Sequence, residues 1–166
     1  MSPQRRRSTG GPGLAVPRAR RAATLVAAVA LGAGLAGCGS DPVQAYCGQV
    51  QADQTRLTTV LAGGGEAALL DALPIFQQLQ AKAPTDIRGD WTTVVRSLSA
   101  LQKALAAAHV DPKKYDAKHP PAGVTPTQQQ AIAQAASGLV SQRTLLALQA
   151  VQQEARDVCH TPLSLS

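Results

Sequence analysis

With 166 residues the chain is long enough for one domain with a real core, and its formal net charge of +6 suggests nucleic acid or an acidic membrane as a partner. The charge is unevenly placed, however, because six of the sixteen Lys and Arg residues lie within residues 1–21. Residues 38–166 hold ten basic and ten acidic residues, and this balance excludes a role in binding nucleic acid.

Residues 1–37 have the layout of a secretory signal peptide. The arginines of residues 1–21 are followed by an uncharged stretch at residues 22–36, AATLVAAVALGAGLA. This stretch is shorter than the roughly 20 residues that a membrane-spanning helix needs. We therefore expect residues 1–37 to be cleaved after export, and an uncleaved anchor is the alternative. The pair Arg20-Arg21 leaves open whether export uses the general or the twin-arginine route.

A cysteine follows the apolar stretch, in the sequence Leu35-Ala36-Gly37-Cys38. These four residues resemble the lipobox of bacterial lipoproteins, which is a leucine, two small residues and a cysteine. The resemblance implies that Cys38 receives a diacylglycerol, that the chain is cut before it, and that residues 38–42 form a lipidated tether. Two or more acyl chains anchor a protein stably, so the resemblance implies the outer, extracytoplasmic face of the cell membrane. An unlipidated signal peptide with a chance cysteine is the alternative.

The part of the chain after Cys38 is rich in alanine, leucine and glutamine and shows no alternating pattern, which predicts helices and no strands. Asp41 and Pro42 are typical of a helix start, and the glycines at 63–65 should end this first helix. A second helix is expected over residues 66–82, with a kink or short break at Pro74.

The third helix has the clearest apolar periodicity in the chain. It is expected to begin near Pro84 and to bury six side chains spaced alternately by four and three residues, namely Ile87, Trp91, Val94, Leu98, Leu101 and Leu105. Residues 109–124 contain prolines and glycine that predict an irregular loop. Thr125 and Pro126 then indicate the start of a long last helix that reaches about Val158.

These segments predict an all-α domain over residues 43–166, a four-helix up-down-up-down bundle with a kinked second helix and a long last helix. Cys47 lies near the start of the first helix and Cys159 at the end of the last, and these two ends lie side by side in such a bundle. Because an exported chain meets an oxidising compartment, we expect a Cys47–Cys159 disulfide. Two free buried thiols are the alternative.

Beyond the lipobox, the two cysteines Cys47 and Cys159 and the sequence APTDIRGDW at residues 83–91 resemble small helical envelope lipoproteins of unknown function from high-G+C bacteria. The resemblance covers most of residues 38–166 loosely. It implies no activity. The Pro-rich loop at residues 109–124 departs from the resemblance.

No recognisable catalytic pattern, such as G-x-S-x-G, occurs in the sequence, and we expect a protein that is not an enzyme and needs no cofactor beyond its lipid. The first functional hypothesis is an interaction or accessory module of the cell envelope, bound to the membrane by its lipid and to an unknown envelope protein. A second is a small-molecule or lipid binder with an apolar pocket lined by Phe76 and Trp91. A weaker third is a metal-binding protein that uses the loop residues His109, Asp111 and His119.

Overall fold

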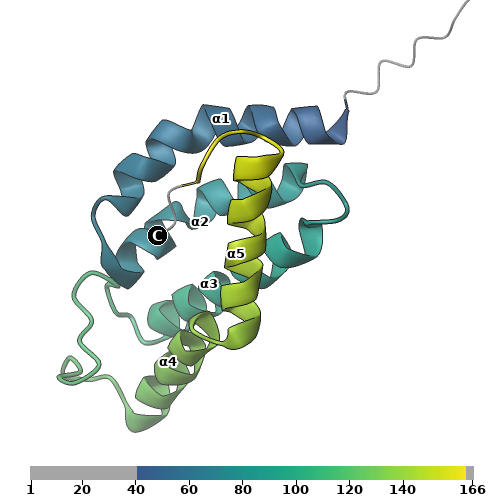
Figure 1. The fold of residues 1–166 in the computed structure, drawn as a ribbon. Helices are drawn as coiled ribbons and strands as arrows, with labels where there is room; N and C mark the ends of the chain where they lie inside the picture. Colours follow the sequence, from purple (N-terminus) through teal and green to yellow (C-terminus); the bar gives the residue numbers. More distant parts are fainter. Residues whose placement is uncertain (1–40, 164–166) are drawn as a thin grey trace, which may run out of the picture. The chain divides into compact units, whose positions relative to one another are not determined.

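The computed structural model describes residues 41–163, so the predicted signal peptide and the lipidation site Cys38 lie outside the described residues. The described residues form five helices and no strand, which confirms the all-α prediction (Figure 1). The helices are α1 (Pro42–Leu61), α2 (Gly65–Lys82), α3 (Arg88–Ala107), α4 (Pro126–Leu139) and α5 (Gln142–Asp157).

Two helices begin at the caps that the sequence predicts. The Asp41 carboxylate accepts a hydrogen bond from the backbone N–H of Val43 at 2.9 Å, and Pro42 follows as the first residue of α1. Thr125 forms a capping box with Gln128 at the start of α4. Both caps satisfy backbone N–H groups that have no partner within their own helix.

α1 ends at Leu61, and Gly64 and Gly65 take positive φ angles of 69° and 73°, which glycine adopts at no steric cost.

The second helix is not interrupted at its proline. α2 continues through Pro74 to Lys82, and Pro74 is exposed. The short break that we considered at Pro74 is therefore absent.

The prediction of one long last helix is wrong, because the chain breaks at Val140 and Ser141. The Ser141 hydroxyl accepts the N–H of Thr144 at 3.3 Å and starts a new helix, α5. The Ser141 hydroxyl also donates a hydrogen bond to the carbonyl oxygen of Gly138 at 2.9 Å, and the Thr144 hydroxyl donates to the same oxygen at 2.8 Å. Serine and threonine side chains compete with the helical hydrogen bonds of the backbone in this way. An unbroken helix would have been roughly 50 Å long.

The break lets α5 fold back onto α3, which is the central helix. α3 packs against α2, α4 and α5, whereas α1 packs on α2. Figure 1 shows α5 running steeply across the direction of α3. The described helices are thus arranged around α3, and the four-helix up-down-up-down order is not confirmed. The six predicted core side chains of α3 are all buried, namely Ile87, Trp91, Val94, Leu98, Leu101 and Leu105.

The predicted disulfide between Cys47 and Cys159 is present, with the two Cα atoms 4.9 Å apart. It forms because the chain reverses after α5. His160 takes a positive φ of 51°, and the N–H of Thr161 bonds the carbonyl of Ala155 at 2.9 Å. The segment that follows crosses α1, where the Gln54 amide donates to the carbonyl of Pro162 at 3.3 Å.

Cys38–Ser166 forms one compact unit. Its disulfide and the core cluster of the described residues lie wholly within it. Experiments on residues 39–166 therefore keep the disulfide and the core cluster of the described residues.

Candidate functional site

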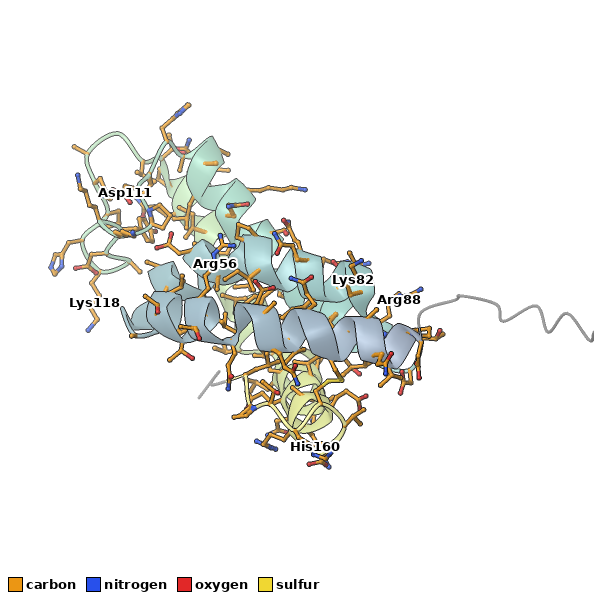
Figure 2. The ribbon with its side chains drawn as sticks, turned by 90° about the horizontal axis from the view of Figure 1, so that it is seen from above. Arg56, Lys82, Arg88, Asp111, Lys118 and His160 are labelled. Carbon is orange, nitrogen blue, oxygen red and sulfur yellow. A yellow bond between two sulfur atoms is a disulfide. The ribbon has the colours of Figure 1, made fainter. Side chains whose placement is uncertain are left out.

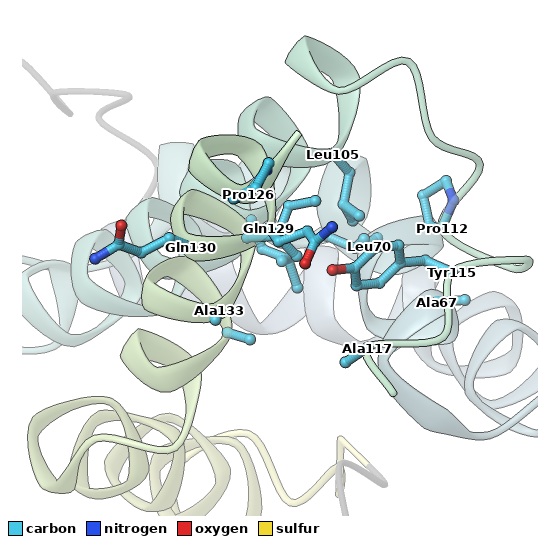
Figure 3. A pocket seen from close by; sticks show the side chains of 13 residues that line it. Ala67, Leu70, Leu105, Pro112, Tyr115, Ala117, Pro126, Gln129, Gln130 and Ala133 are labelled. Atoms are coloured by element: carbon cyan, nitrogen blue, oxygen red, sulfur yellow. The ribbon is translucent and has the colours of Figure 1, made fainter. Parts of the chain in front are cut away.

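A cavity of about 470 Å³ lies between α2, α3, α4 and the loop of residues 109–124, which we call the 109–124 loop (Figure 3). Its volume falls within the range of about 300–1,000 Å³ that small-molecule sites occupy. Residues from three helices and the loop line it, namely Ala67, Leu70, Leu101, Leu105, Pro112, Tyr115, Ala117, Pro126, Gln129, Gln130, Ile132, Ala133 and Ala136.

The walls of the cavity are apolar because helical periodicity directs the apolar faces of two helices toward it. Leu101 and Leu105 are four residues apart and lie one turn above the other on α3. Ile132 and Ala136 have the same spacing on α4. None of the residues that line the cavity carries a formal charge.

The 109–124 loop closes one side of the cavity and is held at three points. The Lys113 ammonium lies 3.0 Å from the Asp71 carboxylate on α2. The hydrogen bond to Asp71 raises the pKa of Lys113. The N–H of Val110 bonds the carbonyl of Leu105 at 3.0 Å. At the other end, the amide of Gln129 donates to the carbonyl of Val124 at 3.0 Å.

Two aspartates shape the loop itself. The side chain of Asp111 accepts the N–H of Lys113 at 3.0 Å, and that of Asp116 accepts the N–H of Lys118 at 2.8 Å. Such turns let a segment without secondary structure satisfy its backbone groups. Figure 2 shows Asp111 and Lys118 together on this loop, apart from His160 near the end of α5.

Three uncharged polar side chains belong to the cavity lining, those of Tyr115, Gln129 and Gln130. The carbonyl of Val124 can only accept a hydrogen bond, so the Gln129 nitrogen must face it and the Gln129 carbonyl oxygen must point elsewhere. The hydroxyl of Tyr115 comes from the loop on the opposite side. In Figure 3 the Tyr115 hydroxyl and the Gln129 amide extend toward one another, whereas the Gln130 side chain points away.

The predicted pocket residues Phe76 and Trp91 do not line this cavity. Both are fully buried, and their ring centroids are 5.7 Å apart. The Trp91 indole N–H donates to the hydroxyl of Tyr46 at 3.0 Å, and burial raises the pKa of Tyr46 to about 12. These two residues belong to the core, so the cavity is not the pocket that the sequence predicted.

The three metal candidates of the loop have structural roles. His109 takes a positive φ of 54° at the end of α3, Asp111 caps a turn, and His119 lies 2.9 Å from Asp116. The hydrogen bond from His119 lowers the pKa of Asp116. Residues 41–163 contain no group of three or more His, Cys, Asp or Glu side chains that could hold a metal.

Sequence reasoning missed the cavity because its parts had been assigned to different roles. Leu101 and Leu105 are predicted as core residues of the third helix, and Tyr115 lies in the predicted irregular loop. A signal was present nonetheless, because a long Pro-rich loop directly follows the most regular apolar helix. Long loops without secondary structure are uncommon in compact domains and are usually either functional or linker segments.

Comparison of the chain with protein-family models, with curated proteins and with solved structures found no match. Among residues 41–163, no helix is both long and apolar enough to cross a bilayer.

Proposed function

We propose that the protein is a membrane-anchored, extracytoplasmic lipoprotein whose helical domain binds an apolar small molecule without transforming it. The observation that carries the proposal is the cavity between α2, α3, α4 and the 109–124 loop. It combines mostly apolar walls with three uncharged polar side chains, and this combination is typical of small-molecule sites.

The chemistry of the lining favours binding over catalysis. Catalysis by proton transfer needs a group whose pKa lies near the working pH. The lining consists of alanine, leucine, isoleucine and proline with Tyr115, Gln129 and Gln130, and it contains no carboxylate, imidazole, thiol or amine side chain.

The proposed location rests on the sequence Leu35-Ala36-Gly37-Cys38, which resembles a lipobox. The Cys47–Cys159 disulfide supports it, because disulfides persist in the oxidising compartments that exported proteins reach. A lipid anchor would hold the domain beside a membrane, where apolar molecules concentrate.

A second candidate, an interaction module for an envelope protein, is supported by exposed apolar side chains. Val140 is 71% exposed and Leu146 is 56% exposed, near the turn between α4 and α5. Scattered apolar side chains are normal on soluble domains, whereas a cavity lined mostly by apolar side chains is a more specific feature. We therefore rank ligand binding first.

Filling the cavity tests the proposal. Ala133 lines the cavity and Ala131 does not, yet both are exposed alanines within α4. We expect residues 39–166 to bind the neutral dye N-phenyl-1-naphthylamine, and Ala133→Trp to weaken this binding at least about tenfold because the indole occupies the cavity. The matched control Ala131→Trp should bind the dye like the parent.

The measurement is a fluorescence titration of the dye, with thermal unfolding to show that both variants fold. Dye binding that survives Ala133→Trp unchanged, or a parent domain that binds no dye, would contradict the proposed function. Trp91 fluorescence is a poor reporter here, because the indole is fully buried and does not line the cavity.

A further inference from the structure

We infer that the cavity selects an uncharged aliphatic molecule that bears a hydroxyl group, and that Gln129 and Tyr115 hold this hydroxyl. The inference rests on the proposed function, since it names the class of ligand for the same cavity. It follows from the charge of the lining, the orientation of one amide and the shape of the walls.

The lining disfavours a charged ligand. No lining side chain is charged, and the nearby Lys113 ammonium is already paired with the Asp71 carboxylate at 3.0 Å. A carboxylate or ammonium held against this lining would lose part of its hydration and would meet no unpaired opposite charge. Burial of an unpaired charge is strongly unfavourable, so a neutral ligand is preferred.

Gln129 supplies an acceptor that a ligand can use in place of solvent. Its nitrogen is committed to the carbonyl of Val124 at 3.0 Å, which leaves its carbonyl oxygen without a hydrogen bond among the described residues. Gln129 is only partly exposed. A ligand group that donates a hydrogen bond would satisfy this oxygen, and an ether or a hydrocarbon would not.

Tyr115 supplies the complementary group. Tyr115 lines the cavity, and a tyrosine hydroxyl can both donate and accept a hydrogen bond. One alcohol oxygen can donate to Gln129 and accept from Tyr115 at the same time. The aliphatic part of the ligand would then lie against Leu101, Leu105 and Ile132.

Chain-matched ligands test the selectivity by displacement of N-phenyl-1-naphthylamine from residues 39–166. The set is 1-dodecanol, its methyl ether, dodecanoate, and the glycerol monoester of dodecanoic acid. We expect 1-dodecanol to bind about tenfold more tightly than the ether, which lacks a donor, and than dodecanoate, which is charged. The monoester carries hydroxyls on a lipid headgroup, and its affinity relative to 1-dodecanol shows whether the hydroxyl of a free alcohol or of a neutral lipid fits better.

Two variants test whether Gln129 and Tyr115 cause the preference for 1-dodecanol over its methyl ether. Gln129→Met keeps the length of the side chain and removes the amide, so the alcohol and the ether should bind it equally while the ether affinity stays at the parent value. The unchanged ether affinity shows that the cavity survives the substitution. Tyr115→Phe should reduce the preference in the same direction. Gln134→Met is the matched control, because Gln134 is an exposed glutamine of α4 that does not line the cavity, and the preference should persist.

Equal binding of 1-dodecanol and its ether by the parent, or tighter binding of dodecanoate, would overturn this inference and leave the proposed function standing. Failure of every ligand and of the dye would remove the proposed function itself. Dye binding that weakens as the protein concentration rises would show that a second copy of the chain occupies the cavity, and would also overturn the inference.

Discussion

Three aromatic side chains illustrate how single residues organise the core of this protein. Tyr46 on α1, Phe76 on α2 and Trp91 on α3 are all fully buried. The indole N–H of Trp91 donates to the Tyr46 hydroxyl at 3.0 Å, and the rings of Trp91 and Phe76 pack at a tilt. The hydrogen bond satisfies the only polar atom of the indole, which would otherwise be costly to bury.

The burial of Tyr46 predicts a loss of stability at alkaline pH. The pKa of Tyr46 is raised from 10.0 to about 12 in the folded protein, so the folded state holds the phenolic proton more tightly than the unfolded state. This contribution is fully present below pH 10 and is lost as the pH rises from 10 to about 12. Urea unfolding across this range should show a loss of roughly 2–3 kcal/mol.

The variant Tyr46→Phe isolates this effect, because it removes the ionisable group and keeps the ring. Its free energy of unfolding should depend less on pH between 10 and 12, although it starts lower for loss of the hydrogen bond from Trp91. Parallel losses in the parent and in Tyr46→Phe would show that other groups cause the alkaline unfolding.

Two histidines have a backbone conformation that their residue type alone does not reveal. His109 and His160 have φ angles of 54° and 51°, and both follow helices. The N–H of Val110, the residue after His109, donates a hydrogen bond to the carbonyl of Leu105. This bond joins the first and last of six consecutive residues, as in a Schellman motif. Histidine tolerates this left-handed conformation better than most residues. His109 ends a helix, and the sequence alone had made it a metal candidate.

At the scale of elements, the break between α4 and α5 has the largest consequence. The hydroxyl of Thr144 is buried and lies 3.0 Å from the hydroxyl of Ser97 on α3. The same threonine donates to the carbonyl of Gly138 at the end of α4. One side chain thus ties together the end of one helix, the start of the next and the central helix.

The cap at Ser141 is testable by a single substitution. Ser141→Ala removes the acceptor for the N–H of Thr144 and the donor to Gly138, and should lower the free energy of unfolding by about 1 kcal/mol in urea titration. Ser137→Ala is the matched control, since the Ser137 hydroxyl only bonds the carbonyl of Ala133 within α4. We expect this control to be neutral or slightly stabilising, because alanine favours the helix interior. If both variants lose the same stability, the cap does not maintain the break.

At the scale of the whole molecule, the disulfide and the proposed anchor assign different roles to the three cysteines. Cys47 and Cys159 join the first helix to the segment after the last, across 112 residues. Cys38 lies outside the described residues, and its lipidation stays a prediction from the sequence.

Intact mass of the full chain purified from membranes tests both roles together. We expect the mass of residues 38–166 plus a diacylglycerol, and a gain of two hydrogens after reduction because one disulfide opens. The control is Cys38→Ala, which should not carry the lipid. An unlipidated chain that retains residues 1–37 would contradict the proposed location, and no gain on reduction would contradict the disulfide.

The sequence by itself determined the features that depend on neighbours in the chain. The caps at Asp41 and Thr125 and the buried stripe of α3 follow from local hydrogen bonding and from a period of 3.6 residues. The disulfide was predictable because only two cysteines remain once Cys38 is assigned to the lipid.

Only the tertiary structure decided where the cavity lies and what lines it. The ion pair of Lys113 with Asp71 joins residues far apart in the sequence, and no periodicity predicts it. The break at Ser141 reflects local competition between side-chain and backbone hydrogen bonds. The position that α5 takes after the break depends on its packing against α3. Packing between distant segments is a property of the whole fold, so a pocket built from three helices and a loop emerges only when they meet.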